Sequence, residues 1–321
     1  MDLELFSRCW FLTGPTASGK TAVGVILAER LHAEIISLDS MAVYRGMDIG
    51  TAKPTEVERQ GIPHHLIDVV APNEEFSIAD YLDAAEQVVK DVQHRGCQVV
   101  FVGGTPLYLT ALLRGLSSGP PPHGEFRRQI QLEVQQHGTQ ALHDRLRQVD
   151  PLAAAKVHPH DLKRMIRALE VYHLTGERIS HQQTQFEESR PASECRVFKL
   201  DWPRQQLHER IARRVDQLFE TGLVAEVRGL LETYGQLSLT ASQAVGYREV
   251  LEYLTGEKTL EQAVCDVKTR TRRFAKHQET WFRRLTECEA VSMSTISSPN
   301  DFSPEDVAED IFRRGADRQV A

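Results

Sequence analysis

The sequence predicts an α/β protein whose core is a parallel β-sheet with helices on both faces, together with an inserted all-helical subdomain. Three observations predict this class. A loop with phosphate-binding spacing follows the first apolar run, and strand-like and helix-like segments alternate through the first third of the chain. A long stretch rich in Gln, His and Arg then has helical periodicity and no convincing strand. Alternating β and α segments build parallel sheets, so the strand-free stretch indicates an inserted helical subdomain.

The phosphate-binding loop joins a strand to a helix. Residues 9–13 are a short apolar run typical of a strand, and residues 20–31 are typical of a helix. The joining residues fit the pattern G-x-x-x-x-G-K-[ST] without a mismatch and read Gly14, Pro15, Thr16, Ala17, Ser18, Gly19, Lys20 and Thr21. Backbone N–H groups at a helix start attract anions, so a di- or triphosphate is expected here in a P-loop NTPase-like core. Lys20 would supply a point charge and the Thr21 hydroxyl a ligand for Mg²⁺. The alternative is a chance glycine-rich turn.

Two further strands are expected beside this loop. Residues 33–38 end at Asp39-Ser40, and residues 98–102 end at Gly103-Gly104-Thr105. Between them, residues 78–95 carry an apolar stripe of helical period. Ligands of parallel sheets sit at the carboxyl ends of the strands, so the loop and both strand ends should share one crevice.

Composition shifts set the expected domain boundaries. We expect a first part of the core at 1–118, a helical insertion at 119–191, core completion and C-terminal helices at 192–291, and a tail at 292–321. A strand is expected at 196–201, followed by helices at 205–234, around 242–253, and at 260–285. The tail is rich in Ser, Asp, Pro and Arg and is expected to be weakly ordered.

The charge is unevenly spread in a chain of net charge -7. Residues 268–284 contain seven basic residues and one acid. Phe274, Trp281, Phe282 and Leu285 recur there at helical spacing and are expected to bury one side of the helix. The basic side then faces outward, as a polyanion contact or as an ordinary solvated face. The same two alternatives hold for Lys163, Arg164 and Arg167 on the helix expected at 161–174.

The bulk composition favours a cytoplasmic enzyme. No apolar run approaches the roughly 18 residues of a membrane span, and no secretory signal is visible. The five cysteines are odd in number and widely spaced, which argues against a disulfide framework or a zinc site.

Asp39 and the Gly103-Gly104-Thr105 turn carry the remaining chemistry, with several alternatives. Asp39 follows a mostly apolar run and could hold Mg²⁺, act as a general base, or cap the following turn. The paired glycines could let a substrate approach the backbone, with Thr105 as a hydroxyl donor, or could serve only a tight turn.

Taken together, the motifs resemble those of the bacterial tRNA dimethylallyltransferase family, also called tRNA isopentenyltransferases. The shared motifs are GPTASGKT (14–21), DSMAVYRGMDIGTAKP (39–54), GIPHHLIDV (61–69), VGGTPLYLTALLRGL (102–116), HPHDLKRMIRALEVYHLTG (158–176), GLVAEV (222–227), QAVGYREV (243–250) and TRRFAKHQETWFRR (271–284). They cover nearly the whole chain except the tail and part of the helical insertion.

This resemblance implies transfer of a dimethylallyl group from dimethylallyl diphosphate to the exocyclic N6 amine of an adenosine in tRNA. The target is the adenosine immediately 3′ of the anticodon, and diphosphate is released. The resemblance also implies that the donor diphosphate, rather than ATP, occupies the loop together with Mg²⁺. The partner would be the tRNA anticodon stem-loop, which delivers a flipped-out adenine to a monomeric enzyme.

Site residues carry over by motif. Asp39 resembles the general base, Thr105 a catalytic and tRNA-contacting position, and Arg214 an arginine that assists the diphosphate. Positions that match tRNA-binding segments are Asp39, Ser40, Met41, Ala42, Thr105, Arg127, Lys163, Arg164, Met165, Ile166, Arg167, Arg273 and Lys276. Ala42 stands where the family commonly has Gln, and His277 where it has Arg, so tRNA recognition at these points is open.

Two other functions remain open from the residues alone. A small-molecule P-loop kinase would also need the loop, Asp39 and a helical lid. A noncatalytic RNA-binding protein could retain an inherited loop. ATP-dependent phosphorylation would indicate the kinase, and tRNA binding without product would indicate the binder.

Overall fold

The chain folds into two compact units. The computed structural model describes residues 2–116, 119–182, 189–294 and 301–318. The core unit comprises Met1–Leu113 and Ser189–Ala321, and the helical unit comprises Arg114–Glu188. The helical unit thus begins and ends a few residues earlier than the expected insertion at 119–191.

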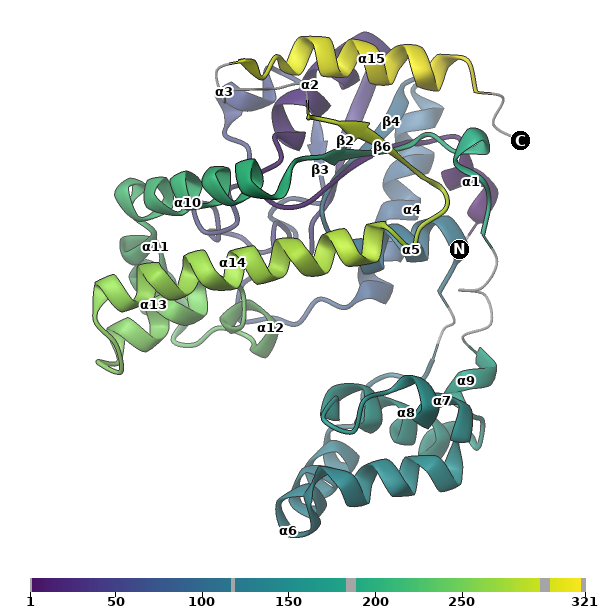
Figure 1. Cartoon of the computed structure of the whole chain (residues 1–321), viewed down its shortest axis with the longest axis vertical. Coiled ribbons are helices and arrows are strands. Elements are labelled where there is room, and N and C mark those ends of the chain that lie inside the picture. Colours follow the sequence, from purple (N-terminus) through teal and green to yellow (C-terminus); the bar gives the residue numbers. More distant parts are fainter. Residues whose placement is uncertain (1, 117–118, 183–188, 295–300, 319–321) are drawn as a thin grey trace. The chain divides into compact units, whose positions relative to one another are not determined.

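The core unit contains one six-stranded sheet in which every pair of neighbouring strands is parallel (Figure 1). Its order is β3-β2-β4-β1-β5-β6. The strands are β1 (Trp10–Thr13), β2 (Ala33–Leu38), β3 (His64–His65), β4 (Gln98–Gly103), β5 (Val197–Asp201) and β6 (Cys288–Ser292). The helices are α1 (Leu3–Ser7), α2 (Lys20–Leu31), α3 (Glu56–Arg59), α4 (Ile78–His94), α5 (Pro106–Arg114), α10 (Arg204–Thr221), α11 (Leu223–Tyr234), α12 (Leu239–Ser242), α13 (Tyr247–Leu254), α14 (Leu260–Phe282) and α15 (Pro304–Ala316).

Strand β1 lies between β4 and β5. Leu12 pairs with Val102 of β4 on one side and with Phe198 of β5 on the other. The chain passes from β1 towards one edge through β2 and later completes the other edge with β5 and β6. The loop after β1 therefore lies where the strand order reverses, which is the usual ligand position in such sheets.

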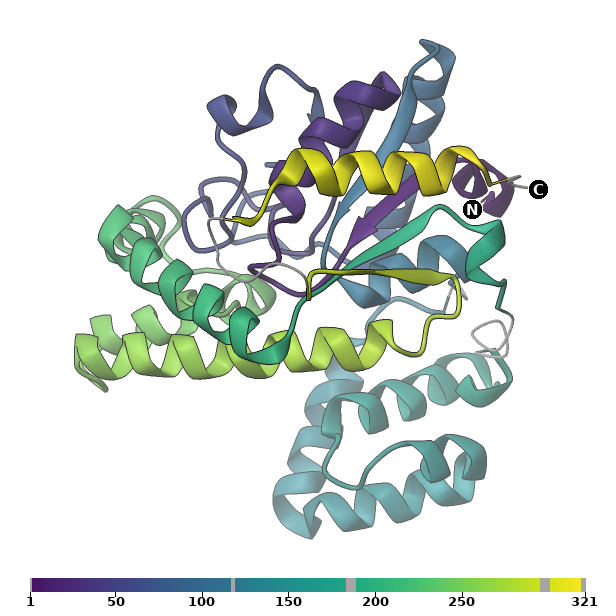
Figure 2. The ribbon, with the colours of Figure 1, turned by 45° about the horizontal axis from the view of Figure 1, so that its top comes forward.

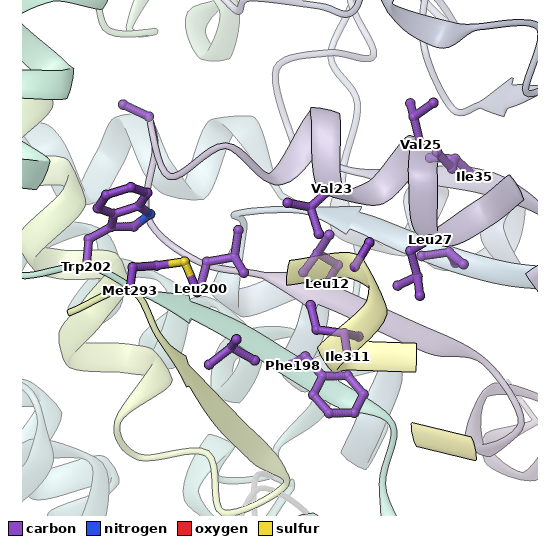
Figure 3. Close-up of a cluster of buried hydrophobic side chains, with 14 of the residues drawn as sticks. Leu12, Val23, Val25, Leu27, Ile35, Phe198, Leu200, Trp202, Met293 and Ile311 are labelled. Carbon is purple, nitrogen blue, oxygen red and sulfur yellow. The ribbon is translucent and has the colours of Figure 1, made fainter. Parts of the chain in front are cut away.

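The two faces of β1 are buried by different helices. Leu12 belongs to the cluster that α2 and α15 cover, together with Phe198 and Ile311 (Figure 3). Helix α15 lies against α2, as Figures 1 and 2 also show. On the opposite face Phe11 stacks on Phe101 at 4.9 Å, and Phe101 contacts Phe6 of α1. Adjacent strand residues point to opposite faces, so one apolar strand can serve both layers.

The expectation of a weakly ordered tail at 292–321 is wrong for the residues that the structure describes. Ser292 ends strand β6, where it pairs with Asp201 of β5. Helix α15 follows, with the Ser303 side chain accepting from the Asp306 N–H at its start and Ile311 fully buried. The polar composition concealed a short apolar stripe that packs on α2. Residues 295–300 and 319–321 of this expectation lie outside the described part.

Two expectations about the C-terminal helices also need correction. The helix expected over 205–234 is broken at Gly222, whose φ of +112° ends α10 and starts α11. On α14, Phe274 and Trp281 are 45% and 38% exposed rather than buried. Phe282 and Leu285 are buried as expected. The helix packs through Phe282 and smaller side chains such as Ala275, so the rings of Phe274 and Trp281 remain accessible.

The helical unit has a core of its own. Its helices are α6 (Gly124–Val149), α7 (Pro151–Lys156), α8 (Leu162–Thr175) and α9 (Ile179–Gln182). Their buried side chains include Phe126, Leu142 and Leu169. The Asp161 side chain caps α8, and Gly176 ends that helix in a left-handed conformation.

Candidate active site

A pocket of about 520 Å³ opens at the carboxyl ends of the core strands. Thr16–Thr21 of the phosphate-binding loop, Asp39–Ala42 after β2 and Gly103–Thr105 at the end of β4 all line it. The shared crevice predicted from the sequence is therefore present. Gly50–Pro54, side chains of α10 and α14, Thr240 of α12 and the following residues Gln243–Val245 also line it.

The loop has the backbone form that an anion site requires. Gly19 adopts a left-handed conformation, with φ of +91°, at the start of α2. Ala17 is also left-handed, with φ of +63°, which is strained for a residue with a side chain. The N–H groups of Ser18 and Gly19 donate to no acceptor in the described part of the chain. These groups, at the positive end of α2, fit a diphosphate.

Lys20 and Arg214 bring positive charge to the pocket. The Lys20 Nζ donates to the Pro15 carbonyl at 2.7 Å. Burial and the neighbouring charge of Arg214 lower the pKa of Lys20 to about 7, against a smaller opposing effect of Asp39. Burial likewise lowers the pKa of Arg214, and Asp39 opposes this. Arg214 has no hydrogen-bond acceptor among the described residues, so its guanidinium is free to meet a bound anion.

Asp39 lies in the same pocket, at the end of β2. Its Oδ1 accepts from the Met41 N–H at 2.8 Å, so the turn-capping role considered above is present. This bond occupies one carboxylate oxygen and leaves the other for proton transfer or metal binding. The Thr105 Oγ1 accepts from the Ser40 N–H at 3.1 Å, and its own hydroxyl hydrogen remains able to donate.

The two glycines at the end of β4, Gly103 and Gly104, allow neighbouring atoms to approach closely. A Cβ at Gly103 would lie 2.2 Å from the Leu38 carbonyl oxygen, and one at Gly104 would lie 2.6 Å from the Gln278 amide nitrogen. A side chain at Gly103 would collide with backbone, and one at Gly104 would displace the Gln278 amide, which supports the tight-turn alternative. The two strand ends are thereby held side by side, so that Asp39 and Thr105 face one space.

Gln278 of α14 is a residue that sequence reasoning did not single out. It is buried, its Oε1 accepts from the Thr16 N–H at 3.0 Å, and its Nε2 donates to the Gly104 carbonyl at 2.6 Å. One side chain thus ties the phosphate-binding loop to the β4 turn. Gln278 lies within a motif quoted above, but nothing in a single sequence distinguishes it from its polar neighbours.

Glu226 of α11 holds the loop of residues 48–50, which leads into the pocket wall at Gly50–Pro54. Its carboxylate accepts from the N–H groups of Asp48, Ile49 and Gly50 at 2.9, 2.6 and 3.2 Å. It also accepts from the Tyr247 hydroxyl at 2.6 Å. Three motifs that are far apart in the sequence therefore form one hydrogen-bond network. A carboxylate that accepts several N–H bonds holds a loop firmly.

Lys53 holds the other end of this loop. The buried Lys53 Nζ lies 2.7 Å from Asp48 and 2.6 Å from Asp68, and it also donates to the Tyr44 carbonyl. The motif residues between Asp48 and Lys53 therefore serve to shape the pocket.

The helical unit holds the other positions expected to bind tRNA. Met165 and Ile166 are buried in its core, so their side chains do not reach a ligand. Arg127 and Arg167 bond to the buried Glu170 at 2.7 and 2.8 Å. The expected common face of three cations on α8 is thereby reduced to the exposed Lys163 and Arg164.

Glu170 is a buried anion balanced by its neighbours. Burial raises its pKa, but hydrogen bonds from Arg127, the His123 N–H and Arg167 outweigh this effect and lower the pKa to about 2. Arg127 and Arg167 thus have a structural role that the sequence did not reveal.

On α14, the basic positions Arg273 and Lys276 are exposed, whereas Phe274 and Arg270 line the pocket. Arg270 also bonds to the buried Glu249.

The two positions that differ from the common family pattern lie in different surroundings. Ala42 lines the pocket, and His277 is exposed.

Across the described ranges, no helix is long and apolar enough to cross a membrane.

Comparison with known proteins decides the family. The sequence model described as IPP transferase matches residues 42–285. The chain belongs to the IPP transferase family. It is 49% identical over 305 residues to a tRNA dimethylallyltransferase of Rhodopirellula baltica, covering 92% of this chain and 91% of the relative. It is 44% identical to a tRNA dimethylallyltransferase of Geobacter metallireducens, covering 89% of this chain and 93% of the relative.

Solved structures of IPP transferases agree with this assignment. A tRNA isopentenylpyrophosphate transferase from Bacillus halodurans aligns with a TM-score of 0.68 at 38% identity, covering 97% of both chains. A eukaryotic dimethylallyltransferase acting on tRNA aligns with a TM-score of 0.74 at 26% identity, covering 97% of this chain and 80% of the other. The fold and the enzyme class predicted from the motifs are therefore confirmed.

Proposed function

We propose that this chain transfers a dimethylallyl group from dimethylallyl diphosphate to the N6 amine of the adenosine immediately 3′ of the anticodon in tRNA. The observation that carries the proposal is the single pocket in which the phosphate-binding loop, Asp39 and Arg214 meet. We further propose that the enzyme acts as a monomer in the cytoplasm on the anticodon stem-loop.

The pocket offers complementary places for the two ends of the donor. The free N–H groups of the loop, Lys20 and Arg214 suit the diphosphate. The apolar side chains of Ile211, Val215, Leu218, Val245 and Phe274 also line the pocket and suit the dimethylallyl group. The target base has to leave the stacked anticodon loop to reach this space.

In the proposed reaction the N6 nitrogen attacks C1 of the dimethylallyl group. The new N–C bond forms as the C1–O bond breaks, and the electron pair of that bond leaves on the diphosphate oxygen. The free carboxylate oxygen of Asp39 takes the N6 proton, a step that contributes about 10²–10⁴-fold. Lys20 and Arg214 stabilise the charge that grows on the leaving oxygen.

The donor set at the loop also fits Mg²⁺. Mg²⁺ prefers oxygen ligands and is commonly held by one or two protein groups together with substrate phosphates and water. The Thr21 hydroxyl lines the pocket beside the loop N–H groups and would hold the ion there. When bound, Mg²⁺ supplies further positive charge to the diphosphate.

Incubation of the full chain with dimethylallyl diphosphate, Mg²⁺ and unmodified tRNA tests the proposal. Nucleoside mass analysis should find prenylated adenosine without any ATP. Phosphorylation that requires ATP would instead support the kinase, and tRNA binding without product would support the noncatalytic binder.

Asp39→Asn separates the general base from the metal ligand. Asn retains an oxygen that can accept the Met41 N–H, so the turn is kept while the base is lost. We expect the chemical step to slow by about 10²–10⁴-fold with diphosphate affinity unchanged. Asp83→Asn, at an exposed position on α4, is the control. If added Mg²⁺ restores Asp39→Asn activity, the carboxylate binds metal and the base assignment is wrong.

A further inference from the structure

The outer side of the phosphate-binding loop is held by Arg210 of α10. Its Nε donates to the Ala17 carbonyl at 2.8 Å. Its guanidinium lies over the ring of Trp202 at 4.1 Å and over that of Phe302 at 5.1 Å. The Trp202 Nε1 in turn donates to the Ser18 carbonyl at 2.9 Å. Two consecutive loop carbonyls are thus bound by side chains outside the loop.

These two bonds orient the anion-binding N–H groups. In a planar trans peptide, the C=O of one residue and the N–H of the next point in opposite directions. With the Ala17 and Ser18 carbonyls turned towards Arg210 and Trp202, the N–H groups of Ser18 and Gly19 point the other way. Neither of these two N–H groups has an acceptor among the residues that the structure describes. Arg210 and Trp202 therefore set the direction of the groups that meet the diphosphate.

Phe302 completes this arrangement from the C-terminal part of the chain. Its ring lies 5.4 Å from that of Trp202, and a Cβ placed on Gly19 would lie 2.7 Å from it. Phe302 therefore packs directly on the loop glycine. It lies beyond the 42–285 match to the family, in the region whose composition indicated a weakly ordered tail.

None of these three side chains lines the pocket. Arg214 does line it, one helical turn further along α10. The two arginines lie on one face of α10 but make different contacts. Arg214 faces the pocket, whereas Arg210 binds the Ala17 carbonyl of the loop. The strained Ala17 conformation also needs such support, because left-handed conformations at residues with side chains persist only where the surroundings fix them.

We propose that Arg210, Trp202 and Phe302 are positioning residues that hold the phosphate-binding loop in its anion-binding conformation. We call the three residues the loop brace. The proposal rests on the proposed function, because it takes the loop to hold the donor diphosphate. The loop brace makes the C-terminal part of the chain a component of the donor site.

Binding of inorganic diphosphate with Mg²⁺ to the full chain, followed by calorimetry, tests the loop brace. We expect Arg210→Gln and Phe302→Leu each to weaken binding by about 10- to 100-fold, since misplacement of about 1 Å has effects of this size. Arg210→Lys should resemble Arg210→Gln, because an ammonium has no planar face to lie over an aromatic ring. Arg213→Gln is the matched control, an exposed arginine of the same helix, and should bind as the wild type does.

Kinetics separate positioning from a general loss of stability. Phe302→Leu keeps an apolar side chain at the site, so the variant should fold. We expect its KM for dimethylallyl diphosphate to rise while its KM for tRNA stays unchanged. An equal loss for both substrates, together with a lowered Tm, would assign these residues a structural role only and would overturn the proposal.

Lys20→Ala distinguishes failure of the loop brace from failure of the proposed function. If the wild type does not bind diphosphate, or if Lys20→Ala binds it as tightly as the wild type does, the assignment of the loop as the diphosphate site is wrong. If Lys20→Ala loses affinity while Arg210→Gln and Phe302→Leu bind as the wild type does, the loop brace alone is wrong. Full affinity of Arg210→Lys would show that charge rather than stacking is needed, and would also overturn it.

Discussion

Binding of diphosphate should draw a proton onto Lys20. In the free chain, burial and Arg214 lower the pKa of this side chain to about 7. A bound diphosphate places negative charge beside Nζ, which favours the ammonium and raises the pKa again. Between the two pKa values the free chain holds fewer protons than the complex. Proton uptake on binding is therefore expected in that window, and the affinity should fall as the pH rises above about 7.

The size of the effect follows from the pKa of the free chain. At pH 8, about one tenth of the Lys20 side chains are charged, so each bound diphosphate should take up about 0.9 proton. The affinity should fall up to about tenfold for each further pH unit while the complex remains protonated. Well below pH 7, Lys20 is already charged and contributes no pH dependence. The same depressed pKa makes folding stability rise with pH through this window, because the unfolded chain then holds the extra proton.

Calorimetry in buffers of different ionisation enthalpy measures this uptake directly. Titration of Mg²⁺-diphosphate at pH 8 into the wild type and into Lys20→Met corrects for protons that the ligand itself binds. We expect the uptake to be smaller by nearly one proton in Lys20→Met. Equal uptake in the two proteins would refute the reasoning, because the titrating group would then lie elsewhere.

Three further perturbations probe the surroundings of the site. Glu226→Gln removes the carboxylate from three loop N–H groups and should lower the free energy of unfolding by about 2 kcal/mol, measured in urea, with faster hydrogen exchange at residues 48–50. Glu170→Gln leaves two arginines without their anion and should destabilise the helical unit by about 3 kcal/mol, seen as faster exchange of α8 amides. Because the pKa of Glu170 is lowered to about 2, its contribution is present above the ordinary pKa near 4.5 and is lost as the pH falls towards 2. Replacing Lys163 and Arg164 together by Gln should flatten the dependence of log tRNA affinity on log salt by about 0.7 for each lost phosphate contact. An unchanged slope would mark this surface as merely solvated.

The elements at the start of the core could be predicted closely. Lys20–Leu31 and Ala33–Leu38 have the bounds that the sequence indicates, because their apolar pattern and the Gly19 boundary are local signals. The crevice followed from a general rule of parallel sheets, given Asp39 and Thr105 at strand ends.

What could not be predicted depends on contacts between distant residues. Helix α15 has a polar composition, and its short apolar stripe can be interpreted only when its packing against α2 is known. Gln278 contacts the loop across 262 positions, and no local pattern announces such a bond. Arg210 stands four positions before Arg214, so their common helix face could be predicted, but not the two aromatic rings that the Arg210 guanidinium contacts.

The place of β5 in the sheet has a consequence for the order in which the molecule assembles. Phe11 of β1 pairs with Val197 of β5, and the whole helical unit lies between them in the chain. During synthesis the first four strands and the helical unit emerge before the central strand gains its second neighbour. Such long-range pairing is slow to form and leaves an unpaired strand edge exposed meanwhile. Because Trp202, Arg210 and Phe302 emerge later still, the phosphate-binding loop should acquire its working shape only when the chain is nearly complete. A chain released before residue 302 should therefore contain every motif of the family and still bind its donor poorly.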